Sequence, residues 1–247
     1  MRPEEARGRL EALGFRPDDV DTLAEHFLDA EARGSLGHGL SRIEWLETWD
    51  ELPVDARPAR VVAEPGYERW DGEGALGYLT LAAVVAAQIA DPPAHARLVV
   101  CSRTFPTGAL GFWVRKLADA GLVAVLTATS PARLASPEGG PPLAGTNPLA
   151  VGIPSSDGRH VVADVSMGAV THGAVLAGQA RPEELVPFGG SQAYKAFALA
   201  VGLQLLVDAL NPEDGFGAVL LVARPESDPA PALRELAAGI RLPGDRR

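Results

Sequence analysis

Apolar side chains recur every three or four positions over the first part of the chain, which predicts amphipathic helices. Residues 3–14 and 17–33 each carry one such stripe. Pro17 stands where the second helix begins, a position that suits proline because its fixed φ is already helical. A third helix follows and ends before Pro53. The stripe of the second helix consists of Val20, Leu23, Ala24, Phe27 and Leu28.

From residue 60 to residue 222, runs of consecutive apolar residues alternate with helical segments. Unbroken apolar runs are typical of strands buried on both faces of a sheet. They predict strands at 60–63, 97–101, 122–126, within 145–154, and at 159–165 and 217–223. The intervening and following patterns predict helices at 78–90, 108–120, 194–210 and 230–238. The helix at 194–210 is apolar nearly all round, so we expect it to be buried. The alternation predicts an α/β fold.

Three glycines have the spacing of the dinucleotide-binding fingerprint of Rossmann folds. Gly72, Gly74 and Gly77 follow a weak apolar run and precede a helix. Asp71 and Glu73 lie inside the same loop, and their negative charges would repel a phosphate. A plain loop is therefore favoured over a phosphate-binding loop, and the fold is expected to lack the Rossmann fingerprint.

Composition limits the classes of function. The formal net charge of -10 argues against a nucleic-acid partner. The one cysteine, Cys101, excludes a disulfide framework and a multi-cysteine metal site; it follows an apolar run and is expected to be buried. No cluster of histidines and cysteines suggests a metal. The N-terminus lacks the apolar stretch of a signal peptide, and the apolar segment 76–90 is too short to span a bilayer. We therefore expect a cytoplasmic protein with no membrane partner.

One Gly-rich stretch carries the residues best suited to chemistry. His38 is flanked by Gly37 and Gly39, and Arg42 follows four residues later. An imidazole transfers protons near neutral pH, and a guanidinium matches a carboxylate. Together they suit a small 2-oxo acid, with Arg42 holding the carboxylate while His38 protonates the carbonyl oxygen. The alternative is a histidine that only occupies a turn and an arginine that only faces solvent. His26, in the middle of a helix, is expected at the surface.

Five short motifs occur in one order along the chain. They are Gly37–Arg42, Gly-Thr-Asn-Pro at 145–148, the segment from Asp164 to Gly173, Gly189-Gly190 with Tyr194-Lys195-Ala196-Phe197, and Leu-Pro-Gly-Asp at 242–245. In this combination the chain resembles the malate/L-lactate dehydrogenase-like oxidoreductases. These are NAD(P)-dependent reductases and dehydrogenases of small acids and cyclic imines, and they do not use a Rossmann fold.

The resemblance implies a role for each matched residue. His38 would donate the proton to the substrate, and Asp164 would lie near it and orient it. Arg42 would bind the carboxylate of a small-molecule substrate, and Thr146 and Asn147 would line the site. NAD(P)H would be the cofactor, with no metal. The residues implied to contact the cofactor are Ser166, Met167, Gly168, His172, Gly189, Gly190 and Lys195. For His172, a polar turn residue without contact to the cofactor remains an equal alternative.

The resemblance also implies an architecture. It is a mixed sheet layered with helices, assembled as a homodimer with active sites at the dimer interface. We expect a helical segment carrying the His/Arg motif (1–58) and an α/β cofactor-binding domain (59–192). A long helix and C-terminal segment (193–247) would pack back on the N-terminal part.

Several positions depart from the family pattern, most of them on the cofactor side. The chain is shorter than full-length members, between Gly173 and Pro187 and after Leu210. Pro106 and Ala174 stand where the family commonly has His and Lys, respectively. These departures leave open a degenerate member that has lost dinucleotide binding and acts in non-redox chemistry or as a binding partner.

Overall fold

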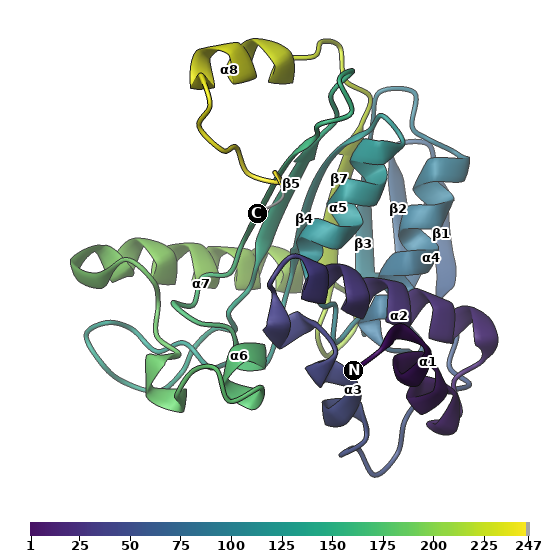
Figure 1. Ribbon diagram of the computed structural model, residues 1–247, viewed down its shortest axis with the longest axis vertical. Coiled ribbons are helices and arrows are strands. Elements are labelled where there is room, and N and C mark those ends of the chain that lie inside the picture. Colours follow the sequence, from purple (N-terminus) through teal and green to yellow (C-terminus); the bar gives the residue numbers. More distant parts are fainter. Residues whose placement is uncertain (246–247) are drawn as a thin grey trace.

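The N-terminal part is helical, as predicted. The computed structural model describes residues 1–245. It contains α1 (Pro3–Ala12), α2 (Pro17–Ala32), the 3-10 helix η1 (Leu36–His38) and α3 (Ser41–Leu46). The apolar stripe of α2 is largely buried in the main core, while Asp18, Asp21 and Glu25 are exposed, as amphipathic periodicity requires. Figure 1 shows these helices packed together at one end of the molecule.

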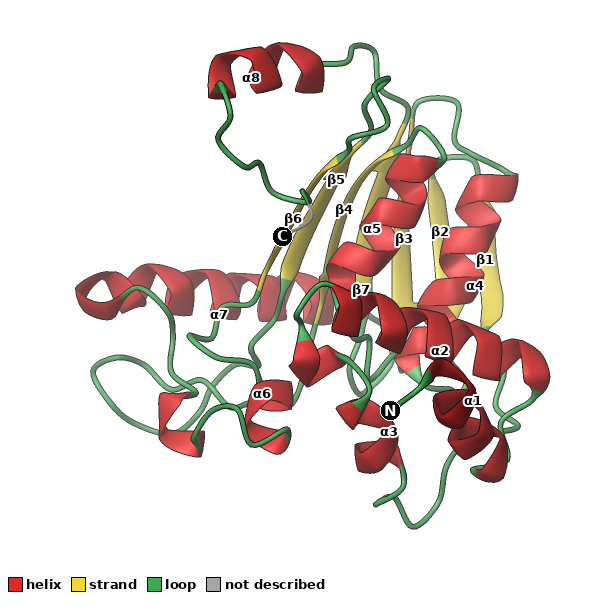
Figure 2. Ribbon diagram, viewed as in Figure 1, coloured by secondary structure: helices red, strands yellow, loops and turns green. Residues whose placement is uncertain are grey.

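A seven-stranded mixed sheet forms the centre of the fold, with strand order β1-β2-β3-β7-β4-β5-β6. Only β2 and β3 pair in parallel; the other neighbours are antiparallel. The strand bounds are β1 (Ala59–Glu64), β2 (Tyr67–Asp71), β3 (Ala96–Ser102), β4 (Val123–Ala128), β5 (Leu149–Ile153), β6 (Val161–Val165) and β7 (Ala218–Ala223). The predicted mixed, non-Rossmann α/β class is confirmed (Figure 2). The sequence pattern missed β2, because polar and charged residues interrupt it.

Helices cover both faces of this sheet. α4 (Gly77–Ala90) and α5 (Leu110–Asp119) pack on one face in the main core, with strand residues such as Val99 and Cys101. Side chains alternate between the faces of a strand. Val100 and Val219 accordingly point to the opposite face, where they pack against Val207 of α7 (Ala193–Leu210). Cys101 is fully buried, as expected, and burial raises the pKa of its thiol to about 12.

Helix α7 is exposed over much of its length, contrary to the prediction. Its buried positions are the small or β-branched residues Ala193, Ala196, Ala200 and Val207. Three of its leucines and a tyrosine face outward: Tyr194, Leu199, Leu205 and Leu206 are 45–61% exposed. The helix extends beyond the edge of the sheet (Figure 1), so one side of it is left uncovered by the rest of residues 1–245. The stretch Gly190–Leu210 has the length and apolar composition of a membrane-spanning helix. A helix in an interface between proteins has the same length and composition.

The C-terminal part belongs to the same sheet. β7 lies between β3 and β4, so the expected boundary at 192/193 does not separate the sheet from the final segment. The chain then continues through α8 (Ala230–Ala237) and returns to the sheet edge, where the Val162 N–H of β6 donates to the Pro243 carbonyl at 3.1 Å. Shorter helices follow β6: α6 (His172–Leu176), η2 (Pro182–Glu184) and η3 (Gly190–Gln192).

Candidate active site

Six of the residues singled out from the sequence line one cavity of about 310 Å³. The N-terminal helices supply two of them, and the loop before β5 and the segment from β6 to α6 supply the others. The fold thus brings together positions that lie more than a hundred residues apart. They are His38, Arg42, Thr146, Asp164, Ser166 and His172.

Arg42 is fixed in place and carries no carboxylate partner. It is 8% exposed, and its Nε donates to the Gly37 carbonyl at 2.7 Å. Its guanidinium lies 4.9 Å from the centre of the Trp45 ring. Gly173 leaves room for it, because a Cβ at this position would collide with Nη2. None of the carboxylates of residues 1–245 pairs with this buried cation, so an anionic ligand is the partner its chemistry calls for.

His38 is neutral at pH 7 in the structure. Burial lowers its pKa to about 3, with smaller contributions from Arg42 and His26. Its Nδ1 is buried and has no hydrogen-bond partner within residues 1–245. A neutral imidazole with an open nitrogen can exchange a proton with a ligand in the cavity.

Asp164 faces the same cavity but does not hydrogen-bond to His38. The Gly111 N–H donates to its Oδ2 at 2.7 Å. Gly111 allows this approach, because a Cβ there would lie only 3.0 Å from Asp164. Desolvation raises the pKa of the Asp164 carboxyl, while the Gly111 N–H and Arg115 lower it. The orienting role implied by the resemblance therefore has no direct contact to support it here.

Asn147, implied to line the site, instead connects loops to α7. It is fully buried, and its Nδ2 donates to the Ala200 carbonyl at 2.9 Å and to Gln204 Oε1 at 3.0 Å. Its Oδ1 accepts a hydrogen bond from the Ser130 N–H at 3.3 Å. Thr146, its neighbour, does line the cavity. Asn147 thus has the contacts of a scaffold residue, which holds the turn that presents Thr146.

The residues implied to contact the cofactor lie in three separate places. Ser166 and His172 line the cavity, and burial, together with Arg133 and Arg42, lowers the pKa of His172 to about 4. Met167 is 2% exposed in a small core cluster. The remaining ones lie outside the cavity lining, near the start of α7 and the bridge between Gly168 and Pro187. They are Gly168, Gly189, Gly190 and Lys195.

Several polar residues of the cavity escaped the sequence interpretation, among them Tyr78, Ser130 and Arg133. Tyr78 belongs to an alanine-rich helix, and Ser130 and Arg133 belong to a Pro/Gly loop. Nothing in these local patterns signals chemistry. The hydroxyls of Tyr78 and Ser130 are buried without a hydrogen-bond partner among the described residues.

The interpretation of His26 as a surface residue was wrong. It is fully buried, and burial lowers its pKa to about 3. Its Nε2 accepts a hydrogen bond from the Ala109 N–H at 3.1 Å. The ring lies among aromatic side chains of α2, α4 and α5, within 4.8–5.8 Å of Phe27, Tyr78, Phe112 and Trp113. Helical periodicity alone does not place His26 in the core, because the pattern follows apolar residues and predicts a stripe that leaves this polar side chain out.

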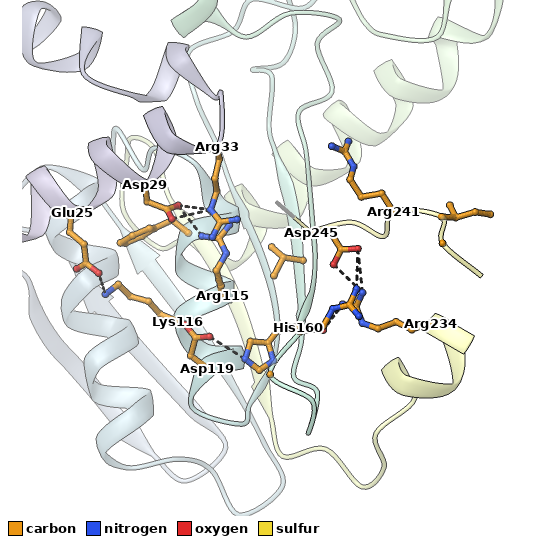
Figure 3. A pocket seen from close by; sticks show the side chains of 17 residues that line it. Glu25, Asp29, Arg33, Arg115, Lys116, Asp119, His160, Arg234, Arg241 and Asp245 are labelled. Atoms are coloured by element: carbon orange, nitrogen blue, oxygen red, sulfur yellow. Dashed lines mark hydrogen bonds and ion pairs between the residues drawn. The ribbon is translucent and has the colours of Figure 1, made fainter. Parts of the chain in front are cut away.

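A second, strongly charged cavity of about 940 Å³ lies between α5 and the C-terminal segment. Figure 3 shows Asp29 between Arg33 and Arg115, and each of these arginines donates to it at 2.9 Å. Arg241 has no marked partner there. In the lining of this second cavity, Arg and Lys residues outnumber carboxylates, although the whole chain carries a net charge of -10. The cations are Arg33, Arg115, Lys116, Arg159, Arg234 and Arg241.

A third cavity, of about 620 Å³, shares residues with both of the others. It has Ser35, Ala109 and Asp164 in common with the first, and Arg33, Arg115 and Arg241 among those in common with the second. We call the first cavity the reaction cavity, and the second and third cavities together the basic groove. No group of three or more potential metal ligands occurs in the part of the chain that the structure describes, residues 1–245.

Known proteins share both sequence and fold with this chain. Residues 4–186 match the family model described as malate/L-lactate dehydrogenase. A Delta(1)-pyrroline-2-carboxylate/Delta(1)-piperideine-2-carboxylate reductase of Pseudomonas syringae pv. tomato is 31% identical over 181 residues, 71% of this chain and 52% of that protein. A (2R)-3-sulfolactate dehydrogenase (NADP(+)) of Chromohalobacter salexigens is 31% identical over 185 residues, 70% of this chain and 54% of that protein. The chain thus spans about half the length of these relatives.

Solved structures confirm the fold. Malate dehydrogenase of Entamoeba histolytica aligns with a TM-score of 0.83 at 18% identity, covering 99% of this chain and 86% of that one. The delta1-piperideine-2-carboxylate reductase of Pseudomonas syringae aligns with a TM-score of 0.82 at 24% identity, covering 99% and 89%. The family model covers well over half of the sequence. The chain is therefore a member of the malate/L-lactate dehydrogenase family.

Proposed function

We propose that the protein is an NAD(P)H-dependent reductase of a small 2-oxo acid or cyclic 2-imino acid. The observation that carries this proposal is Arg42, a buried cation without a carboxylate partner among residues 1–245, in the same cavity as His38. A carboxylate bound to Arg42 would place its C2 atom within the cavity that His38 faces. Relatives named as reductases of such acids support the reaction class.

In this mechanism the substrate itself prepares His38 for catalysis. Without substrate, burial and the positive charge of Arg42 keep the imidazole neutral. A carboxylate on Arg42 offsets that charge, which raises the pKa of His38 and favours the imidazolium. The imidazolium then gives its proton to the oxygen or nitrogen at C2. Reduced nicotinamide, when bound, supplies the hydride to C2.

The residues along the basic groove suit a dinucleotide diphosphate. Arg33, Arg115 and Arg241 line cavities that adjoin the reaction cavity through Asp164. A guanidinium group binds phosphate in a bidentate manner, with two parallel N–H···O hydrogen bonds. Ser166 and His172 line the reaction cavity itself and would contact the nicotinamide end. The other candidate location for the phosphates is the turn with Gly189 and Gly190 beside Lys195, which lies outside the reaction cavity lining.

The second candidate is a degenerate member that binds a carboxylate without redox chemistry. It is favoured by one observation: the family match ends at residue 186, before Gly189, Gly190 and Lys195. Titration of NADPH and NADH with fluorescence detection separates the two candidates. The reductase proposal predicts saturable binding of one cofactor, followed by its oxidation when a panel of 2-oxo acids and cyclic imines is added. Neither binding nor oxidation with any combination would favour the degenerate member.

We also propose that two copies of the chain pair through the exposed side of α7. Its outward leucines form an apolar surface that no other part of residues 1–245 covers. Fully burying an exposed leucine contributes about 1.5–3 kcal/mol, so covering the roughly half of each side chain that is still exposed contributes about 1 kcal/mol. The proposed homodimer therefore explains why an apolar helix lies at the surface of this fold, and it agrees with a cytoplasmic protein.

A further inference from the structure

The Tyr78 hydroxyl is a buried polar group without a partner. Tyr78 lies in the second position of α4 and is 1% exposed. Its hydroxyl oxygen has no hydrogen-bond partner among residues 1–245. Leaving a hydroxyl unpaired in a protein interior costs about 1–3 kcal/mol. Phenylalanine would avoid that cost in the same space. The hydroxyl is therefore best explained by a hydrogen-bond partner that is not part of residues 1–245.

The ring is held firmly from three sides. His26 packs against its edge at 4.9 Å between ring centres, and Phe27 packs at 5.2 Å in a T-shaped arrangement. Gly108 approaches so closely that a Cβ there would collide with Cε1 of the tyrosine. The hydroxyl therefore has one fixed position and does not need to be ordered when a ligand arrives.

Tyr78 belongs to the lining of the reaction cavity. Tyr78, His38 and Arg42 all line the cavity. Burial raises the pKa of the Tyr78 hydroxyl, and Arg42 is the one charged group that acts on it, in the opposite direction. The hydroxyl thus remains protonated at neutral pH and is available as a hydrogen-bond donor to a ligand in the cavity that Arg42 also lines.

We propose that Tyr78 is a substrate-binding residue whose hydroxyl donates a hydrogen bond to the carboxylate held by Arg42. The inference rests on the proposed function for the identity of the ligand. It explains the orphaned hydroxyl, because a carboxylate offers up to four acceptor positions and Arg42 occupies only part of them. The cavity would then recognise the carboxylate by one ionic and one neutral donor.

The test is Tyr78→Phe, which removes only the oxygen. Since the hydroxyl is unpaired in the free protein, the variant should keep or raise the melting temperature. Its affinity for a carboxylate should fall about 10-fold. If Tyr78 served only in packing, the substitution would not lower the carboxylate affinity while keeping or raising the melting temperature. Tyr67→Phe is the matched control, because Tyr67 lies in a different cluster, next to Val100 and Val219.

The binding probe is oxamate, an unreactive analogue of a 2-oxo acid, titrated by calorimetry with and without NADPH. We expect about 10-fold weaker binding by Tyr78→Phe than by the wild type and by Tyr67→Phe. In turnover assays the same variant should raise KM about 10-fold and change kcat by less than about 3-fold, because the contact is equal in the ground and transition states. Equal oxamate affinity of Tyr78→Phe and wild type would overturn the role of Tyr78 and leave the reductase proposal intact.

A measurement on the unaltered protein guards against a variant that folds poorly. Tyrosine labelled at Cζ gives one carbon resonance for each of the three tyrosines, which the single variants assign. Oxamate should shift the Tyr78 resonance and leave that of Tyr67 in place; no shift at saturation would contradict the contact. Weaker oxamate binding by Tyr78→Phe in a protein that never oxidises NAD(P)H supports the Tyr78 contact and contradicts only the reductase. Absence of oxamate binding by the wild type would overturn both.

Discussion

At the scale of single residues, the reaction cavity is lined by two guanidinium groups, Arg42 and Arg133, and by a histidine, His38, that burial holds neutral. Burial lowers the pKa of His38 to about 3 and raises the pKa of the Asp164 carboxyl. The cavity therefore carries a positive potential before substrate arrives. In the proposed reaction, an incoming carboxylate would balance that potential and so would couple substrate binding to protonation of His38.

Arg42→Gln tests the charge itself. The variant keeps a polar side chain but loses the cation, so kcat/KM for the 2-oxo acid should fall by at least about 100-fold. NADPH affinity, measured by fluorescence, should stay within about 3-fold of the wild type, because Arg42 contacts the substrate end. An unchanged kcat/KM would remove Arg42 from the site.

His26 should make the fold sensitive to acid. Its pKa in the folded protein is about 3, below the value of about 6.5 for an exposed histidine. Below pH 6.5 the unfolded chain therefore binds more protons than the folded one, and the free energy of unfolding falls as the pH falls toward 3. This single group contributes a slope of up to about 1.4 kcal/mol per pH unit. Urea unfolding of His26→Gln at pH 5 and pH 7 should show a smaller loss than the wild type; an equal loss would contradict the assignment.

At the scale of elements, hydrophobic periodicity predicted most helices and strands but not their surroundings. It located α2, α4, α5 and β4 because each has one clear period or one unbroken apolar run. It missed β2, because charged residues flank Trp70 on both sides and interrupt the apolar run. It also wrongly buried α7, because an apolar surface is the same pattern whether the chain itself or another molecule covers it. Only the spatial arrangement separates these two cases.

The exposed side of α7 makes a prediction about assembly. Leu205→Lys places a charge on a position that is 61% exposed in the single chain. If this side pairs two copies, the variant should be monomeric by light scattering after size-exclusion chromatography, while the wild type is a dimer. The matched control is Leu236→Lys on α8, 84% exposed, which should leave the dimer intact. A monomeric wild type, or a Leu205→Lys dimer as stable as the wild type, would contradict the proposal.

At the scale of the whole molecule, the fold joins a small reaction cavity to the basic groove. Six residues singled out from the sequence line the reaction cavity, because the His38 and Arg42 motif is local and its chemistry is specific; their roles in catalysis and binding stay predictions. The sequence did not predict the groove, because Arg33, Arg115 and Arg241 come from separate elements and each resembles an ordinary surface arginine. Asn147 shows the converse, since its place in a distinctive motif does not reveal that its amide faces α7.

The groove can be tested as the phosphate site. Arg241 has no hydrogen bond or ion pair to the other residues drawn in Figure 3, so Arg241→Gln should leave stability unchanged. If the groove holds the diphosphate, this variant should weaken NADPH binding about 10-fold, with a shallower salt dependence, because an Arg–phosphate contact is lost. Arg181→Gln, at an exposed position outside the groove, should bind like the wild type. Loss of binding in Lys195→Ala instead of Arg241→Gln would place the phosphates at the Gly189-Gly190 turn.

The central claim is that this family member transfers a hydride to a carboxylate substrate with His38 as the proton donor. The most direct test follows the absorbance of NADPH or NADH in the presence of a 2-oxo acid or a cyclic imino acid, with the wild type and with His38→Ala. We predict oxidation by the wild type and a loss of kcat of about 100- to 10,000-fold in the variant, with cofactor affinity retained. Equal turnover by both proteins would show that another group donates the proton, and no oxidation by the wild type with any cofactor and substrate would contradict the reductase itself.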